Sequence, residues 1–232
     1  IELDEENIDA YITAVGSNLF PTGLRETLMQ FTEAENFGSL IRPSVGDVTD
    51  IRNILAEKNM SSNLLLFDTH QKVLKVLEQA QFLGMKYHVV VANPPYMGGK
   101  GQNNRLKEFA KKYYPDSKSD LFAMFIERNM DLTLKGGYIG MMTSYTWMFL
   151  SSYEKLRARI LEDNTIITLV RPEFHAFFDS AFVTICGFVL YSLPIPDFKG
   201  GFIDLNEFYG ADIQGPKALE IIKNYNSYLM GA

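Results

Sequence analysis

Residues 93–96 read Asn-Pro-Pro-Tyr and directly follow a run of four small or branched apolar residues, 89–92. Such a run predicts a buried parallel strand, and Pro94 and Pro95 end its ladder because proline has no N–H donor. The side-chain oxygen of Asn93 and the Pro94 carbonyl then lie at the carboxyl end of a strand, where open α/β sheets place their sites. Tyr96 adds an aromatic ring that can stack on a flat ligand.

Residues 93–96 resemble the Asn-Pro-Pro-Tyr motif of amino-group methyltransferases that use S-adenosylmethionine. An exocyclic amine on a nucleobase is a poor nucleophile, because its lone pair is delocalised into the ring. Two acceptors against the NH2 group, the Asn93 oxygen and the Pro94 carbonyl, favour a pyramidal nitrogen whose lone pair points at the methyl group. Tyr96 stacks on the target base. The plain alternative is a strand end closed by a Pro-Pro turn with a surface Tyr.

Composition sets broad limits on the chain. Its 232 residues, 47% of them hydrophobic, suffice for one large domain with a core. A single cysteine, Cys186, excludes an intrachain disulfide and favours a reducing cytoplasm. The three histidines and this cysteine are scattered, so no metal site is expected. The longest apolar run is too short for a membrane span, and a net charge of -6 argues against a broad nucleic-acid surface.

The elements that must position residues 93–96 follow from periodicity. Leu24, Leu28 and Phe31 share one helical face in the N-terminal part. After the expected strand 86–92, Ser119 is a suitable N-cap for a helix over 120–135. The pattern predicts a short helix through Leu55, a longer amphipathic helix that ends at Gly84, and a helix that runs from the capping box at 151–154 to roughly residue 162. Further strands are predicted over 138–143, 165–170, 182–191 and 202–208. This order predicts one half of a doubly wound α/β sheet.

Between the motif and that helix, residues 97–102 are glycine-rich and basic but lack the spacing of a phosphate-binding loop. We interpret them as a mobile loop that could order over DNA. Lys107, Lys111 and Lys112 extend the positive charge, and a solvated helix face is the plain alternative.

The resemblance covers about residues 37–191 and is closest to the methyltransferases of BREX phage defence and to type IIG-like enzymes, which are adenine-specific. It implies a class I, Rossmann-like methyltransferase fold with one antiparallel strand, preceded by N-terminal helices. It also implies that Ser39 and Leu40, together with Asn93, lie against the cofactor. An aromatic residue before the last strand would stack on the second face of the base. By position this is Phe178, with Phe177 and Phe182 as competitors.

One departure from the family is clear. No Gly-x-Gly pattern precedes residue 93, although the family's cofactor loop should lie there. We therefore expect a fragment of a longer enzyme, inactive alone. We expect an N-terminal helical segment (1–46), a partial methyltransferase domain (47–210) and a C-terminal helix (211–232) that leads to a missing domain.

The resemblance implies a site-specific DNA adenine N6-methyltransferase of restriction-modification or phage defence. It would use S-adenosylmethionine and double-stranded DNA in the cytoplasm, without metal or membrane, and other defence proteins are possible partners. Two alternatives stay open. Glutamine N5-methyltransferases of proteins use the same motif, and a methyltransferase-like scaffold could serve binding alone.

Overall fold

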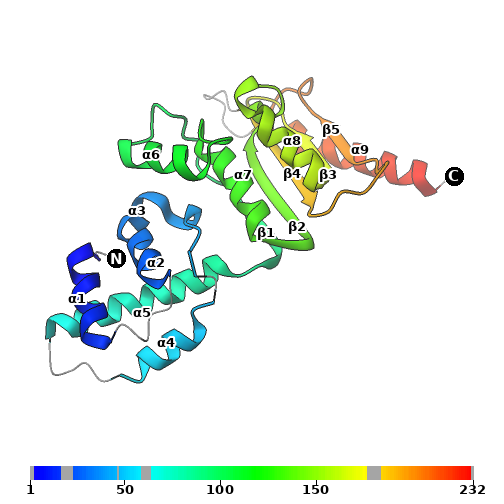
Figure 1. Cartoon of the computed structure of the whole chain (residues 1–232). Helices are drawn as coiled ribbons and strands as arrows, with labels where there is room; N and C mark the ends of the chain where they lie inside the picture. Colours follow the sequence, from blue (N-terminus) through cyan, green and yellow to red (C-terminus); the bar gives the residue numbers. More distant parts are fainter. Residues whose placement is uncertain (1–2, 17–22, 46, 59–63, 177–183, 231–232) are drawn as a thin grey trace. The chain divides into compact units, whose positions relative to one another are not determined.

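The structure is a computed structural model that describes residues 3–16, 23–45, 47–58, 64–176 and 184–230 (Figure 1). The chain divides into two compact units, Ile1–Lys86 and Tyr87–Ala232. The motif at residues 93–96 therefore belongs to the second unit. The predicted three-part division of the chain stays a prediction.

The described part of the first unit is helical. Its longest helix, α5, packs against three shorter helices, α1, α2 and α4. Leu24, Leu28 and Phe31 are buried, as their spacing predicts, and so are Val73 and Leu77 of α5. The helices of this unit are α1 (Glu5–Val15), α2 (Leu24–Gln30), η2 (Phe31–Glu33), α3 (Ala34–Phe37), η3 (Gly38–Leu40), α4 (Thr49–Ala56) and α5 (Leu64–Gly84).

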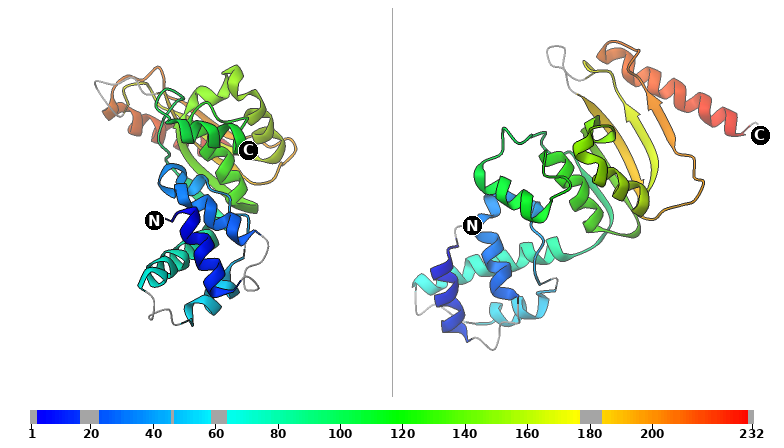
Figure 2. Two further views of the ribbon diagram at one scale, coloured as in Figure 1. Left: turned by 60° about the vertical axis from the view of Figure 1, so that its left-hand side comes forward. Right: turned by 45° about the horizontal axis from the view of Figure 1, so that its top comes forward.

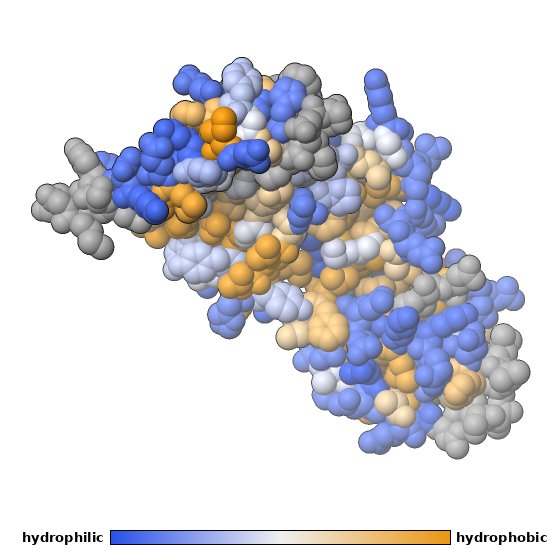
Figure 3. Space-filling model, turned by 180° about the vertical axis from the view of Figure 1, so that it is seen from behind, coloured by the Kyte–Doolittle hydropathy of each residue, from blue (hydrophilic) through white to orange (hydrophobic). Residues whose placement is uncertain are grey.

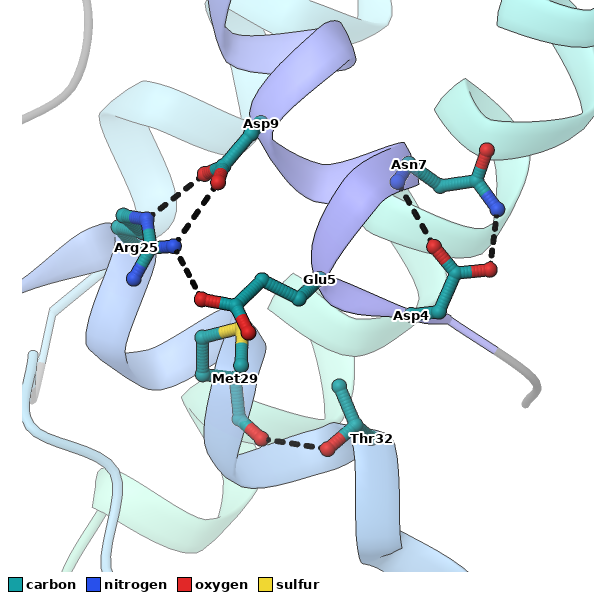
Figure 4. A network of polar contacts seen from close by, with 7 residues as sticks. All are labelled: Asp4, Glu5, Asn7, Asp9, Arg25, Met29 and Thr32. Carbon is teal, nitrogen blue, oxygen red and sulfur yellow. Dashed lines mark hydrogen bonds and ion pairs between the residues drawn. The ribbon is translucent and has the colours of Figure 1, made fainter.

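Arg25 joins α1 to α2 at the surface of the first unit (Figure 4). Its Nε and Nη2 donate to the Asp9 carboxylate over 2.7 and 2.9 Å, and Nη2 also reaches Glu5 at 2.8 Å. The hydrogen bond from Arg25 holds the pKa of Asp9 below its usual value. At the start of α1 the Asp4 carboxylate accepts from the backbone N–H of Asn7, which caps the helix.

The second unit is an α/β structure with a five-stranded mixed sheet in the order β1-β2-β4-β3-β5 (Figure 2). Strand β1 runs parallel to β2, and β4 lies antiparallel between β2 and β3. The predicted antiparallel strand is thus confirmed. The strands are β1 (Tyr87–Ala92), β2 (Thr133–Ser144), β3 (Thr165–Arg171), β4 (Ile185–Tyr191) and β5 (Gly201–Asp204), and the helices α6 (Asn104–Tyr113), α7 (Leu121–Leu132), α8 (Glu154–Asp163) and α9 (Ala211–Met230), with the short 3-10 turns η4 (Tyr145–Met148) and η5 (Ser151–Tyr153).

Helices α7 and α8 lie on the same side of this sheet (Figure 1). Their apolar stripes meet the alternate strand residues that point the same way, such as Ile139 of β2 and Phe188 of β4. Phe122, Ile126 and Ile160 complete this core from the helices. Burial of this apolar area is the main term that holds α7 and α8 on the strands.

The opposite side of the sheet is open where β1 ends, which corrects one prediction. Val89 and Val91 were expected in a buried strand, yet their side chains are 59% and 76% exposed. Strand β1 stands at one edge of the sheet, and α7 covers only the other side of it. Apolar side chains gather on the side of the second unit seen in Figure 3.

Candidate active site

Residues 93–96 form an irregular turn immediately after the last paired residue of β1. Ala92 is still aligned with Met141 of β2, and the strand ends there. Pro94 is buried, whereas Asn93 and Pro95 are exposed. The proline that follows Asn93 removes a backbone donor from this turn, which is why pairing stops at this point. Asn93 is therefore accessible to solvent at the strand's carboxyl end.

A carboxylate from another element holds the turn in place. Asp120 Oδ1 accepts the backbone N–H of Met97 at 2.9 Å, directly after Tyr96, and also that of Phe122 at 3.2 Å. The Met97 carbonyl in turn accepts from the N–H of Leu121 at 3.1 Å. Asp120 thus fixes the end of the motif to the start of α7.

This contact also corrects the sequence prediction for the start of α7. The N-cap is Asp120 and not Ser119, because the Asp120 carboxylate accepts the amide of the helix's second residue. Burial raises the pKa of Asp120, and hydrogen bonds from the amides offset part of that rise. The signal available in the sequence was a carboxylate at the helix start, but its second partner, Met97, lies 23 residues away.

Tyr96 is half-exposed and has an aromatic neighbour. Its ring meets the buried Phe122 edge to face, with 6.2 Å between centroids and 88° between planes. Phe122 also contacts Tyr153, at 5.8 Å. Burial, with a smaller effect from Cys186, raises the pKa of the Tyr96 phenol. Phe122 covers one side of the ring, and Tyr96 stays 39% exposed to solvent.

The carboxyl ends of β2 and β3 lie at the same end of the sheet as that of β1. Strand β2 ends at Ser144, whose hydroxyl pairs with those of Thr146 and Thr184, each at 2.9 Å. The N–H of Tyr145 donates to the Thr184 carbonyl at 3.0 Å. These bonds fix the chain that enters β4 beside the chain that leaves β2.

Strand β3 contributes charged groups to this edge. Arg171 pairs with Asp204 through two hydrogen bonds, at 3.0 and 2.5 Å. The buried Glu173 accepts from the backbone N–H and the Nδ1 of His175, at 2.9 and 2.8 Å. Burial opposes ionisation of Glu173, but the bonds from His175 keep the pKa of its carboxyl below the usual value. Gln214 of α9 accepts the Glu173 N–H at 3.1 Å.

The remaining predicted residues are placed as follows. Phe178, Phe177 and Phe182 lie outside the described residues. Ser39 and Leu40 lie in the first unit, in the turn η3, which Gly38 opens with a φ of 50°. Ser39 is exposed in a shallow hollow of that unit, and Leu40 is buried. Their roles at a cofactor stay predictions, as does the stacking role of Phe178.

The strand end has room for an organic cofactor. A hollow borders the exposed Val91 and Asn93, and Gly140 of β2 places no side chain in it. Asn93 supplies a polar group at the rim of this apolar surface, so these residues fit one end of S-adenosylmethionine. A cluster of three or more metal-binding side chains is absent from the residues that the structure covers. In the same part of the chain, no helix could cross a membrane.

Comparison with known proteins assigns the chain to a family. Residues 18–178 match the model of the Eco57I restriction-modification methylase family. The chain belongs to this family. The matched region of this Eco57I-type methylase includes the Asn93–Tyr96 turn and Asp120.

Two curated relatives share that assignment. The adenine-specific methyltransferase BrxX of Escherichia coli (strain HS) is 41% identical over 157 residues, which is 66% of this chain and 13% of BrxX. The adenine-specific methyltransferase PglX of Lacticaseibacillus casei (strain Zhang) is 33% identical over 221 residues, or 91% of this chain and 18% of PglX. The Eco57I-type chain thus spans less than a fifth of the length of either relative.

Solved structures include distant matches. A nuclease-deletion mutant of the Type ISP restriction-modification enzyme LlaGI, in complex with a DNA substrate mimic, is 17% identical, with a TM-score of 0.46. The match covers 73% of this chain and 18% of LlaGI. A class I S-adenosylmethionine-dependent methyltransferase from Listeria monocytogenes is 16% identical with a TM-score of 0.43, covering 94% of this chain and 80% of that one.

Proposed function

We propose that the protein containing this chain transfers a methyl group from S-adenosylmethionine to the exocyclic N6 amine of an adenine in double-stranded DNA. The observation that carries the proposal is the Asn-Pro-Pro-Tyr turn at the carboxyl end of β1, with Asn93 and Tyr96 exposed, in a chain of this methylase family. The similarity to two adenine-specific methyltransferases supports adenine as the target.

Each residue of the turn has a part in this reaction. The Asn93 side-chain oxygen and the Pro94 carbonyl accept the two N–H bonds of the amine, which turns its lone pair out of the ring plane. The cofactor supplies an electrophilic methyl group when it is bound. Positive charge then grows on the amine, and preorganised acceptors stabilise it more strongly than water can. One N–H proton of the methylated amine is finally released to solvent, which leaves neutral N6-methyladenine. Tyr96 stacks on the base that has left the duplex. This contact replaces part of the stacking energy lost in the duplex, which is on the order of a few kcal/mol.

Asp120 and Phe122 support this geometry from α7. Asp120 anchors the chain after Tyr96, and the Phe122 edge restricts the Tyr96 ring. A catalytic turn held at both ends loses less freedom when the base arrives, so more of the binding energy serves the transition state.

The wider setting belongs to the same proposal. We place the enzyme in restriction-modification or phage defence, acting at specific DNA sites in the cytoplasm. Other proteins of a defence system are candidate partners. The similarity to BrxX and PglX supports this setting.

The test is to incubate the full-length protein with cofactor carrying an isotopically labelled methyl group and with duplex DNA. Digestion to nucleosides should yield labelled N6-methyladenine. A parallel reaction offers proteins with exposed glutamine residues. Label on glutamine alone would replace the proposal with a protein methyltransferase, and no label on either substrate would favour a non-catalytic scaffold.

A further inference from the structure

Positive charge is concentrated in the segment between the catalytic turn and α7. Residues 98–118 contain six of the chain's 22 Lys and Arg residues but only two of its 28 Asp and Glu residues. The whole chain has a formal charge of -6, so this segment is positively charged within a negatively charged chain.

Helix α6 sorts this charge to one side. Leu106 and Ala110 are buried, whereas Arg105, Lys111 and Lys112 are exposed. At about 100° per residue, these three cations and the half-buried Lys107 lie within an arc of about 160° opposite the buried stripe. The exposed Glu108 lies within the same arc, so that side of α6 carries four cations and one carboxylate. Lys100 and Lys118 flank the helix and are exposed as well. The result is a basic helix face, formed by the four cations of α6.

The segment begins and ends at the catalytic turn. Gly98 forms an isolated antiparallel bridge with Asp120, so the chain that enters the segment 98–118 lies beside the chain that leaves it. The Gln102 side chain donates to the Met97 carbonyl at 3.3 Å, and the Ser117 hydroxyl donates to Glu127 of α7 at 2.7 Å. These bonds attach both ends of the segment that contains α6 to the chain that follows residues 93–96.

We propose that the basic helix face of α6 binds backbone phosphates of duplex DNA next to the target base. The proposal rests on the proposed function, because the neighbouring site must take a nucleobase. The ten residues of α6 extend about 15 Å, a length over which duplex DNA presents about nine phosphate charges. Four cations on that length suit several contacts, and contacts of this kind set position and affinity without reading sequence.

The test removes two of these cations in the full-length protein. In the double variant Lys107→Gln and Lys111→Gln, glutamine keeps helix propensity nearly unchanged. The dissociation constant for duplex DNA is measured over a range of salt concentrations. Each lost phosphate contact lowers the slope of log affinity against log salt by about 0.9, so the slope should fall by about two. Affinity at moderate salt should fall about tenfold.

The matched control removes the same charge elsewhere. Lys135 and Lys199 are exposed and lie where β2 and β5 begin, at the end of the strands opposite to residues 93–96. Lys135→Gln with Lys199→Gln should leave the slope unchanged. Equal slopes in the wild type and the α6 variant, or an equal fall in the control, would overturn the inference.

The two proposals can fail separately. A wild-type protein that methylates DNA while the α6 variant keeps its slope would refute this inference alone. A protein that binds DNA through α6 but transfers no methyl group would refute the proposed function alone. A wild type that binds no duplex would refute both.

Discussion

Asp120 connects two segments of the chain at this site. One of its carboxylate oxygens serves two amides, that of Met97 after the catalytic turn and that of Phe122 in α7. Capping α7 and holding the turn at residues 93–96 are separate roles, and different substitutions can separate them. A position shift of about 1 Å at a reacting group can cost about a hundredfold in rate.

Three variants of Asp120 therefore have different expected effects. Asp120→Asn keeps an oxygen acceptor for both amides, so the turnover number should stay within about threefold of the wild type. Asp120→Ser keeps a helix cap, but its shorter side chain does not reach Met97, so turnover should fall about a hundredfold with stability retained. Asp120→Ala should lose the helix cap and the contact with Met97, so turnover should fall and the free energy of unfolding should decrease by about 1 kcal/mol.

The measurements are steady-state methylation of DNA and denaturant unfolding of the same variants. If Asp120→Ser retained full turnover, or if the loss of rate followed the loss of stability across the three variants, Asp120 would be a helix cap only. Rescue by Asp120→Asn alone supports a positioning role, because the amides require an acceptor and not a charge.

At the scale of elements, the pairing of β1 with β2 positions the turn at residues 93–96. Gly137 of β2 has no room for a side chain, since a Cβ there would lie 2.6 Å from the His88 carbonyl oxygen and 2.8 Å from Thr133 Cγ2. Gly140, three residues on, has room, because its Cβ would be 3.6 Å from the Val91 side chain. The two glycines of one strand thus form a matched pair.

Gly137→Ala should lower the free energy of unfolding by about 1–3 kcal/mol, since overpacking forces backbone shifts. Gly140→Ala should change it by less than about 0.5 kcal/mol. Denaturant unfolding of both variants is the check. Equal effects of the two substitutions would contradict the strand register described here.

Sequence patterns predicted the elements well but not their surroundings. The stripe Leu24, Leu28 and Phe31 followed from helical periodicity, and the strand over 86–92 followed from a continuous apolar run. Both signals depend on local sequence alone. The burial of Val89 and Val91 was predicted wrongly, because coverage depends on which elements cross the sheet. Local sequence does not contain that information.

The site was predictable to a similar degree. The motif at residues 93–96 is continuous, so its order and its place after a strand were readable from the chain. The contacts of Asp120 with Met97 and of Phe122 with Tyr96 bridge more than 20 residues and required the fold. The pairing of the Glu173 carboxylate with His175 depends likewise on the burial of that carboxylate.

At the scale of the whole molecule, cofactor binding should depend on more than these 232 residues. Residues 1–92 contain no Gly-x-Gly pattern. In that pattern the glycines let the backbone approach the cofactor closely, because they have no side chain, and other residues cannot do this. We expect the chain by itself to bind S-adenosylmethionine weakly or not at all. Calorimetric titration of the 232-residue chain is the measurement, and clear micromolar binding would refute the expectation.

The most direct test of the central claim is the effect of Asn93→Ala on single-turnover methylation by the full-length protein. Because Asn93 is assigned to the amine in the transition state, its loss should fall on the rate constant and leave the affinity for DNA largely unchanged. We predict that methylation is abolished while the DNA dissociation constant and the unfolding temperature stay near those of the wild type. Undiminished methylation by Asn93→Ala, or a parallel loss of DNA binding in a folded variant, would contradict the account.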